Sequence, residues 1–231
     1  MSLPLALAVI AVLGYVYYLG QIAIHNCVHY TLFKKRELNR RVGLVLCSIQ
    51  LTHFDGWRAA HMMHHRFAQS ERDPHRVDRH LLPYILTHYY RIAKYTWEPK
   101  RYFMAVAPPI LVALAVIAWQ ASVGEPLRGV VWVAVFWLIP IMISHALVAH
   151  FNFITHAELP YGRGHDTRSF NEGIWRVINK LTFNFYLHAE HHFSPHVPVP
   201  QPDPKLYDPE TAPPSIKEAA RARAAAETVA G

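Results

Sequence analysis

Three long apolar runs without a charged residue dominate this sequence and restrict it to a membrane fold. They are Leu3–Ile24, Phe103–Val123 and Gly129–Phe151. As a helix, the first run rises roughly 33 Å, which is enough to cross a bilayer. Val42–Phe54 is also mostly apolar but too short to span, so we expect it to lie in the interface or to re-enter the membrane. The sequence predicts an all-α integral membrane protein with three to four transmembrane helices.

The basic residues predict an orientation. The chain carries a formal charge of +7, and "KKRELNRR" follows the first apolar run while a second basic stretch, residues 66–101, precedes the next one. Both stretches flank the spans on one side, which the positive-inside rule makes cytoplasmic. The apolar runs argue against nucleic acid as the reason for the positive charge. We expect one catalytic domain over residues 1–200, followed over residues 201–231 by a Pro-rich strap and a short Ala-rich helix.

Histidine is the second unusual feature, with 17 residues against 16 Asp and Glu. Ten histidine and asparagine residues occur in four clusters with spacings of i, i+3 or i+4, which place the members of each cluster on one helix face. Imidazole is a suitable ligand for iron, zinc, copper and nickel. The clusters are His25 and His29; His61, His64 and His65; Asn152 and His156; and His188, His191 and His192.

All four clusters fall at the basic end of a predicted span or in the segments beside it, so they can converge in a histidine-rich helical cap at the cytoplasmic face. Nine histidines exceed the four to six ligands that one metal usually takes, and favour two metal ions. The other eight histidines are expected at the surface or in packing. One of them, His145, shares a helix face with Asn152 and His156. It is expected either to line a substrate channel or to form hydrogen bonds between helices.

A histidine ligand normally donates its second ring N–H to a carboxylate or carbonyl group. Candidate carboxylates are Asp55, Asp73 and Glu190, with Glu158 and Asp166 as further possibilities, and each could equally be a solvated surface charge. Trp57 precedes the second cluster and is a candidate for the same surroundings. The sequence contains neither Glu-x-x-His nor His-Glu-x-x-His, which leaves an all-imidazole ligand set. Ligand type alone does not separate iron from zinc.

Together these motifs resemble the membrane fatty acid desaturase and hydroxylase superfamily over roughly residues 20–200. The three boxes of that superfamily correspond to "HNCVH", "HMMHH" and "HAEHH". The segment "NFITH" resembles an element of stearoyl-CoA desaturases in which the histidine is a further iron ligand and the asparagine binds through water. "DGWRAAHMMHH" with "RDPH", and "HAEHHFSPHVP", resemble the surroundings of the second and third desaturase boxes.

The resemblance implies two iron ions, held by the nine clustered histidines and by Asn152 through water, and O₂ as co-substrate. It implies removal of hydrogen from an unactivated C–H bond of a lipid or another long apolar substrate. No fused haem-binding domain is evident, so a separate electron carrier such as a ferredoxin is expected. Zinc in purified protein would be adventitious. The expected location is the bacterial inner membrane, with the histidine site on the cytoplasmic side.

The sequence leaves other functions open. Within the same superfamily, the alternative to a desaturase is a hydroxylase or ketolase acting on a lipid, carotenoid or alkane. In a different class, a zinc-dependent membrane hydrolase would have more spans and fewer histidines. A third class is a haem-binding electron-transfer protein. Haem needs only paired axial histidines, and the nine clustered histidines of this chain exceed that number.

Overall fold

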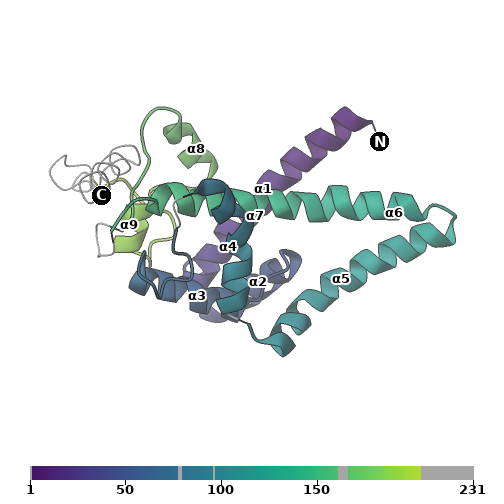
Figure 1. The fold of residues 1–231 in the computed structure, drawn as a ribbon, viewed down its shortest axis with the longest axis horizontal. Helices are drawn as coiled ribbons and strands as arrows, with labels where there is room; N and C mark the ends of the chain where they lie inside the picture. Colours follow the sequence, from purple (N-terminus) through teal and green to yellow (C-terminus); the bar gives the residue numbers. More distant parts are fainter. Residues whose placement is uncertain (1, 78–79, 96, 161–165, 204–231) are drawn as a thin grey trace, which may run out of the picture. The chain divides into compact units, whose positions relative to one another are not determined.

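The computed structural model describes residues 2–77, 80–95, 97–160 and 166–203, in which the regular structure consists of helices and contains no strand (Figure 1). This confirms the predicted all-α class. In chain order the elements are α1 (Leu3–His29), α2 (Arg36–Ile49), α3 (Phe54–Phe67), α4 (Leu81–Tyr95), α5 (Pro99–Ser122), α6 (Pro126–Val133), the π-helical turn η1 (Ala134–Leu138), α7 (Ile139–His156), α8 (Trp175–Leu181) and α9 (His188–Phe193).

Three helical stretches are long and apolar enough to cross a membrane, and they confirm the three predicted spans. They are α1, α5 and the continuous stretch Pro126–His156 that α6, η1 and α7 form together. Proline near the start of α5 and of α6 fits the first helical turn, where a backbone N–H has no partner within the helix. The chain is therefore an integral membrane protein.

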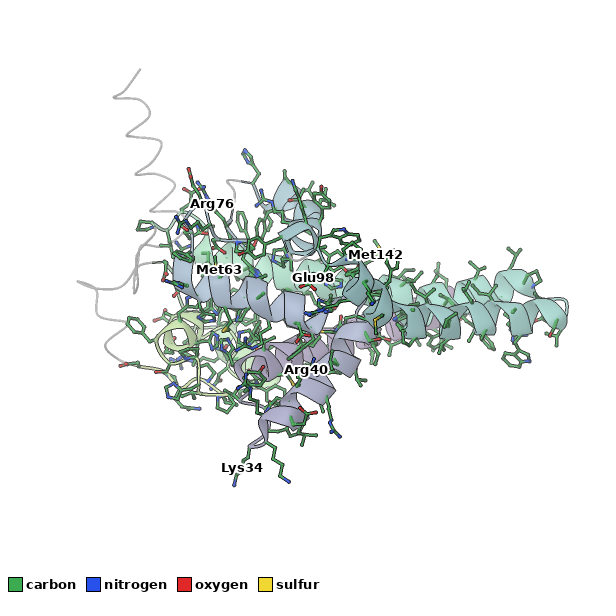
Figure 2. The ribbon with its side chains drawn as sticks, turned by 90° about the horizontal axis from the view of Figure 1, so that it is seen from below. Lys34, Arg40, Met63, Arg76, Glu98 and Met142 are labelled. Carbon is green, nitrogen blue, oxygen red and sulfur yellow. The ribbon has the colours of Figure 1, made fainter. Side chains whose placement is uncertain are left out.

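The short apolar segment Val42–Phe54 does not form one element. Helix α2 begins at Arg36 and ends at Ile49, and α3 begins at Phe54. With 14 residues, α2 is too short to cross a bilayer. Basic residues before and within α2, including Lys34 and Arg40, are exposed (Figure 2). The interfacial or re-entrant position of this segment stays a prediction.

The chain divides into two compact units, described separately below. The first comprises Met1–Arg58 and Ala93–Val148, and the second comprises Ala59–Ile92 and Ala149–Gly231. The predicted strap and Ala-rich helix lie almost wholly outside the described residues, which end at residue 203. The proposed division into a domain over residues 1–200 and a tail over residues 201–231 stays a prediction.

A network of polar side chains joins α1, the end of α2 and α7 within the first unit. Gln21 Nε2 and Ser144 Oγ both donate to Gln50 Oε1, over 3.0 and 2.9 Å. His145 Nδ1 lies 3.1 Å from Gln21 Nε2, and His145 Nε2 lies 3.1 Å from the Gln50 carbonyl oxygen. Because a carbonyl only accepts, Nε2 is assigned as the protonated nitrogen of a neutral ring. The structure thus places His145 in hydrogen bonds between helices, the second of the two roles expected for it.

The corner between α2 and α3 depends on a glycine. The side chain of Phe54, the first residue of α3, is fully buried. It packs on Gly43 of α2 so closely that a Cβ atom at Gly43 would lie 2.2 Å from Phe54 Cε2. Only a residue without a side chain allows this approach.

We predict that Gly43→Ala destabilises the protein by about 1–3 kcal/mol, because the Phe54 ring must leave its packed position to make room for the methyl group. Thermal unfolding of the detergent-solubilised protein measures the effect. Leu38→Ala, at an exposed position on the same helix, is the control and should unfold like the unmodified chain. Equal melting temperatures for the two variants would contradict the packing argument.

In the second unit, α4 packs through one face. Tyr84, His88 and Ile92 are buried at helical spacing, whereas Leu82, Leu86 and Tyr90 on other faces are exposed. Tyr84 belongs to a small core with Val77 from the loop before α4, Ala149 from α7 and Ala157, the residue that follows α7. The same packing directs the imidazole of His88 into the interior of this unit.

Candidate metal centre

Four histidines from three helices form a group in the second unit that could hold a metal ion. His64 comes from α3, His156 is the last residue of α7, and His188 and His192 lie one turn apart on α9. Each offers one ring nitrogen, and these nitrogens all lie within 4.8 Å of one another. The closest contact recorded among them is 3.0 Å, between Nε2 of His156 and Nε2 of His188. We call these residues the four-histidine group.

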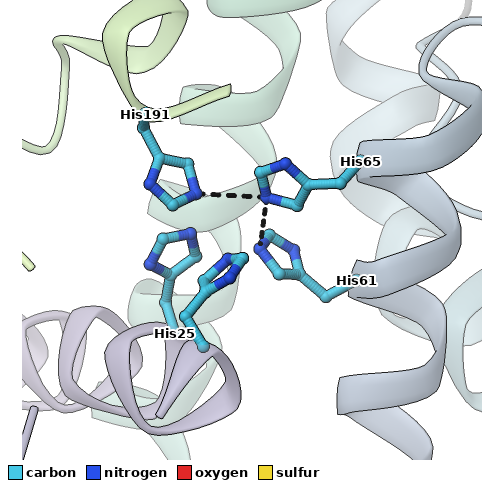
Figure 3. A group of neighbouring side chains, drawn as sticks. His25, His61, His65 and His191 are labelled. Carbon is cyan, nitrogen blue, oxygen red and sulfur yellow. Dashed lines mark hydrogen bonds between the residues drawn. The ribbon is translucent and has the colours of Figure 1, made fainter. Parts of the chain in front are cut away.

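Three further histidines of the same unit lie beside this group. His65 Nε2 is 3.1 Å from His61 Nε2 and also 3.1 Å from His191 Nε2 (Figure 3). The ring of His65 stacks on that of His192, with centroids 4.3 Å apart. The helical spacing within α3 and α9 therefore brings two neighbouring sets of imidazoles together, as the sequence predicts for each helix separately.

His25 and His29 occupy the last two turns of α1 in the first unit. Their ring centroids lie 4.9 Å apart, as expected for residues at i and i+4 on one helix face. The helix ends directly after them, because Tyr30 adopts a left-handed conformation with φ of 61°.

Asp73 fixes the orientation of the His64 ring. His64 Nδ1–H donates to the Asp73 carboxylate, with both oxygens 3.0 Å away. The backbone N–H groups of Gln69 and His75 also donate to this carboxylate, each over 2.8 Å. Burial alone would raise the pKa of the Asp73 carboxyl, but the His64 imidazole and these hydrogen bonds hold that pKa below its usual value. Asp73 is thus ionised, and His64 directs its other nitrogen, Nε2, away from it.

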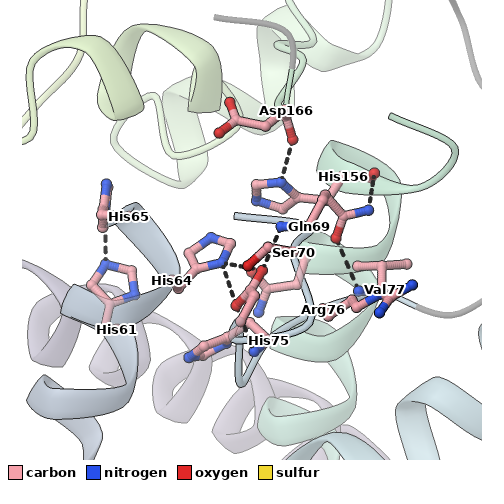
Figure 4. A network of polar contacts seen from close by, with 12 residues as sticks. His61, His64, His65, Gln69, Ser70, His75, Arg76, Val77, His156 and Asp166 are labelled. Atoms are coloured by element: carbon pink, nitrogen blue, oxygen red, sulfur yellow. Dashed lines mark hydrogen bonds and ion pairs between the residues drawn. The ribbon is translucent and has the colours of Figure 1, made fainter. Parts of the chain in front are cut away.

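A backbone carbonyl has the same effect on His156. Its Nδ1 donates to the Asp166 carbonyl oxygen over 2.6 Å, which leaves Nε2 as the ligand nitrogen (Figure 4). It is the main chain of Asp166 that makes this bond to the ring. Among the described residues, Nε2 of His64 and Nε2 of His192 are buried and have no hydrogen-bond partner.

The other candidate carboxylates have different surroundings. Glu190 on α9 accepts a hydrogen bond from Ser169 Oγ, which in turn accepts one from the backbone N–H of Ala189, so these contacts anchor α9 to the preceding loop. Asp55 forms a partly exposed ion pair with Arg40, 3.3 Å away in the first unit. Trp57, also in the first unit, is buried.

Two side chains that no sequence motif indicated hold the end of α7, and with it His156. Gln69 Nε2 donates to the His156 carbonyl oxygen over 2.9 Å. Arg168 is buried, and its Nη2 donates to the Ala157 carbonyl oxygen over 2.7 Å. Burial lowers the pKa of the Arg168 guanidinium to about 10, so it stays charged beside the carbonyl end of the helix.

Two histidines outside the predicted clusters, His75 and His88, are buried next to the site. The ring of His75 lies 5.0 Å from that of His64, centroid to centroid, and 5.3 Å from that of His88. Burial, with the neighbouring His64 and His88, lowers the pKa of His75 well below its usual value, so this ring is neutral. Asn152 is buried and its Nδ2 lies 3.1 Å from His88 Nε2.

The residues of the second unit fit a metal ion. Two imidazole nitrogens 3.0 Å apart can share one proton at most, so the four-histidine group offers several lone pairs to the same small volume. Two of its rings are held through their Nδ1 atoms, which is the usual way that a protein orients histidine ligands. An all-nitrogen set of this kind suits iron, zinc, copper or nickel.

The fold and this centre define a membrane-embedded protein with a multi-histidine metal site. The chain belongs to the fatty acid desaturase family, because the model of that family matches residues 2–203. This confirms the resemblance found in the sequence and makes the chain a member of a superfamily of membrane di-iron oxidoreductases. No curated protein matches the chain at a significant level.

We predict that Asp73→Asn lowers the metal affinity of the four-histidine group by roughly ten- to a hundredfold, because the amide no longer holds His64 in one tautomer. Metal retained against a graded chelator, measured by mass spectrometry of the eluted ions, reports the change. Asp55→Asn removes the same charge from a surface ion pair and should retain metal like the unmodified protein. If both variants lose metal equally, Asp73 has no special part in orienting His64.

Proposed function

We propose that this protein is an O₂-dependent di-iron desaturase that introduces a double bond into the hydrocarbon chain of a lipid. The observation that carries the proposal is the gathering of histidines in the second unit, with ring nitrogens close to one another and, among the residues that the structure describes, no carboxylate in the ligand set. In a family of membrane oxidoreductases, such a set is suited to iron and O₂.

We propose two ligand sets for the two irons. The four-histidine group would hold one iron, with a water held by Asn152 as a further ligand. His61, His65 and His191 would hold the other. We assign His25 and His29 to this second iron, since they are the first of the three histidine boxes and lie together on one face of α1.

The reduced irons would supply the electrons with which O₂ is activated to remove two hydrogens from the substrate. For balance, the substrate chain and O₂, with two electrons and two protons from outside, give the alkene and two waters. The chain's own residues hold the imidazoles in place. Asp73 and the Asp166 carbonyl keep His64 and His156 in fixed tautomers, and burial keeps bulk water from these rings.

A groove in the first unit supports a long apolar substrate. Its volume is about 820 Å³, and its walls come from α2, α5, α6 and η1. Apolar side chains line nearly all of it, and the hydroxyl of Ser48 on its wall donates to the Ala105 carbonyl oxygen over 2.5 Å. The π-helical turn contributes Phe136 and Trp137, and π-helical turns often occur at functional sites.

The electrons would come from a separate acidic carrier such as a ferredoxin. The exposed basic residues before and within α2 support this proposal, since they offer positive charge to such a partner. The same charges support a cytoplasmic location of the histidine site. We further propose the inner membrane of a bacterium as the membrane in which the protein lies.

Product analysis tests the proposed reaction. We predict that membranes of a host without desaturases, on expressing this chain, acquire lipids with two hydrogens fewer, and that His64→Ala abolishes the product because a ligand is lost. His196→Ala, at an exposed histidine outside the ligand sets, should leave the product unchanged. A product that gains one oxygen would instead establish a hydroxylase, and activity in His64→Ala would refute the ligand assignment.

The groove can be tested by filling it. We predict that Ala113→Trp lowers the yield from long chains at least tenfold and favours shorter ones, because the indole occupies space that the hydrocarbon needs. Ala115→Trp places the same ring at an exposed position of α5 outside the groove and serves as control. Chain-length profiling by mass spectrometry compares the two variants, and identical profiles would show that the substrate binds elsewhere.

A further inference from the structure

In the second unit, hydrogen bonds connect three buried side chains. They are His75 in the loop that precedes α4, His88 on α4 and Asn152 on α7. His75 Nδ1 lies 3.3 Å from His88 Nε2, and the same His88 nitrogen lies 3.1 Å from Asn152 Nδ2. The exposed fractions of His75, His88 and Asn152 are 2%, 5% and 6%. Polar groups buried to this degree need hydrogen-bond partners, so these contacts hold the three side chains in defined orientations.

The direction of each hydrogen bond follows from the donors available. An amide nitrogen can only donate, so His88 Nε2 must be the acceptor of the bond from Asn152 and carries no proton. His75 Nδ1 must then be the donor in the second contact. The roles of the ring nitrogens and of the amide atoms are assigned from this network.

This arrangement fixes which end of the Asn152 amide is available to other groups. Asn152 lies one turn before His156 on the same face of α7. Its Nδ2 is committed to His88, whereas its Oδ1 makes no hydrogen bond to any residue that the structure describes. A carbonyl oxygen accepts hydrogen bonds, and a water molecule that is bound to a metal donates them.

We propose that His88 is a positioning residue that fixes the Asn152 amide so that Oδ1 accepts a hydrogen bond from a water ligand of the metal in the four-histidine group. The inference rests on the proposed function for the metal and its water. It adds a residue outside the histidine boxes and explains why the buried face of α4 carries an imidazole beside Tyr84. Without the acceptor at His88, the Asn152 amide could rotate and turn its NH₂ group toward the water. An NH₂ group cannot accept a hydrogen bond from that water.

Two substitutions at His88 separate the acceptor from the shape of the ring. His88→Phe keeps a ring but removes the lone pair, whereas His88→Gln supplies an oxygen that can accept from Asn152. The full chain is loaded with ⁵⁷Fe(II) in detergent and measured by Mössbauer spectroscopy. We expect His88→Phe to shift the doublet of one iron as Asn152→Ala does, and His88→Gln to restore the wild-type doublet.

The double variant tests whether His88 acts through Asn152. Residues that act through one contact are not additive, so Asn152→Ala combined with His88→Phe should give the spectrum of Asn152→Ala alone. Tyr84→Phe removes a neighbouring buried hydrogen bond, from Tyr84 Oη to the His75 carbonyl oxygen, and should leave both doublets unchanged. A wild-type spectrum in His88→Phe, or an additive change in the double variant, overturns the proposal.

A measurement without metal keeps this inference distinct from the proposed function. In metal-free protein labelled with ¹⁵N-histidine, solid-state NMR should show His88 Nε2 as unprotonated, and Asn152→Ala should shift that resonance. A protonated Nε2 overturns the assignment of His88 whatever the metal. Fewer than two irons in the unmodified protein, with the expected NMR result, would overturn the iron site and leave the His88–Asn152 contact established.

Discussion

A histidine that binds a metal offers one nitrogen to it, and the contact made by the other nitrogen decides where the ring points. That constraint governs this site. Asp73 holds Nδ1 of His64, and the Asp166 carbonyl holds Nδ1 of His156. Each contact selects one tautomer and directs Nε2 to the opposite side of the ring. Helical spacing alone would place these side chains on the correct faces but would leave each ring free to turn.

The same requirement explains the unusual polar residues around α7. A buried arginine and a glutamine bind the carbonyl groups at the end of this helix, where no intrahelical donors remain. Because His156 is the last residue of α7, a frayed end would displace a ligand. Arg168 and Gln69 therefore stabilise the backbone from which the ligand projects.

Within the first unit, four polar side chains of α1, α7 and the end of α2 form hydrogen bonds with one another, namely Gln21, Gln50, Ser144 and His145. Gln50 uses its side chain and its carbonyl to bind residues of α1 and α7. Each unpaired polar group in the interior of a membrane costs several kcal/mol, so such a network fixes the packing of these helices. The groove beside it, with walls from α2, α5, α6 and the π-helical turn, is lined almost entirely by apolar side chains.

Much of this architecture can be predicted from the sequence, because its signals are local. Uncharged runs of about twenty residues predict the three spans, and the histidine spacing predicts which side chains share a helix face. The detailed limits differ, since α2 begins at Arg36 and the apolar segment after Val42 is interrupted before Phe54. Hydropathy does not register a turn whose residues are themselves apolar or uncharged.

The surroundings of the ligands could not be predicted in this way. Asp73 and Asp55 were equal candidates in the sequence, yet one is buried against His64 and the other pairs with Arg40 at the surface. His88 and Asn152 are 64 positions apart and meet only because α4 packs its buried face in the second unit. The residue types and their helical periodicity by themselves determined that this protein is a helical membrane protein with clustered histidines. Tertiary structure alone decided which carboxylate and carbonyl orient those histidines and which imidazole contacts Asn152, because such contacts join helices to loops or to other helices and depend on how these segments pack.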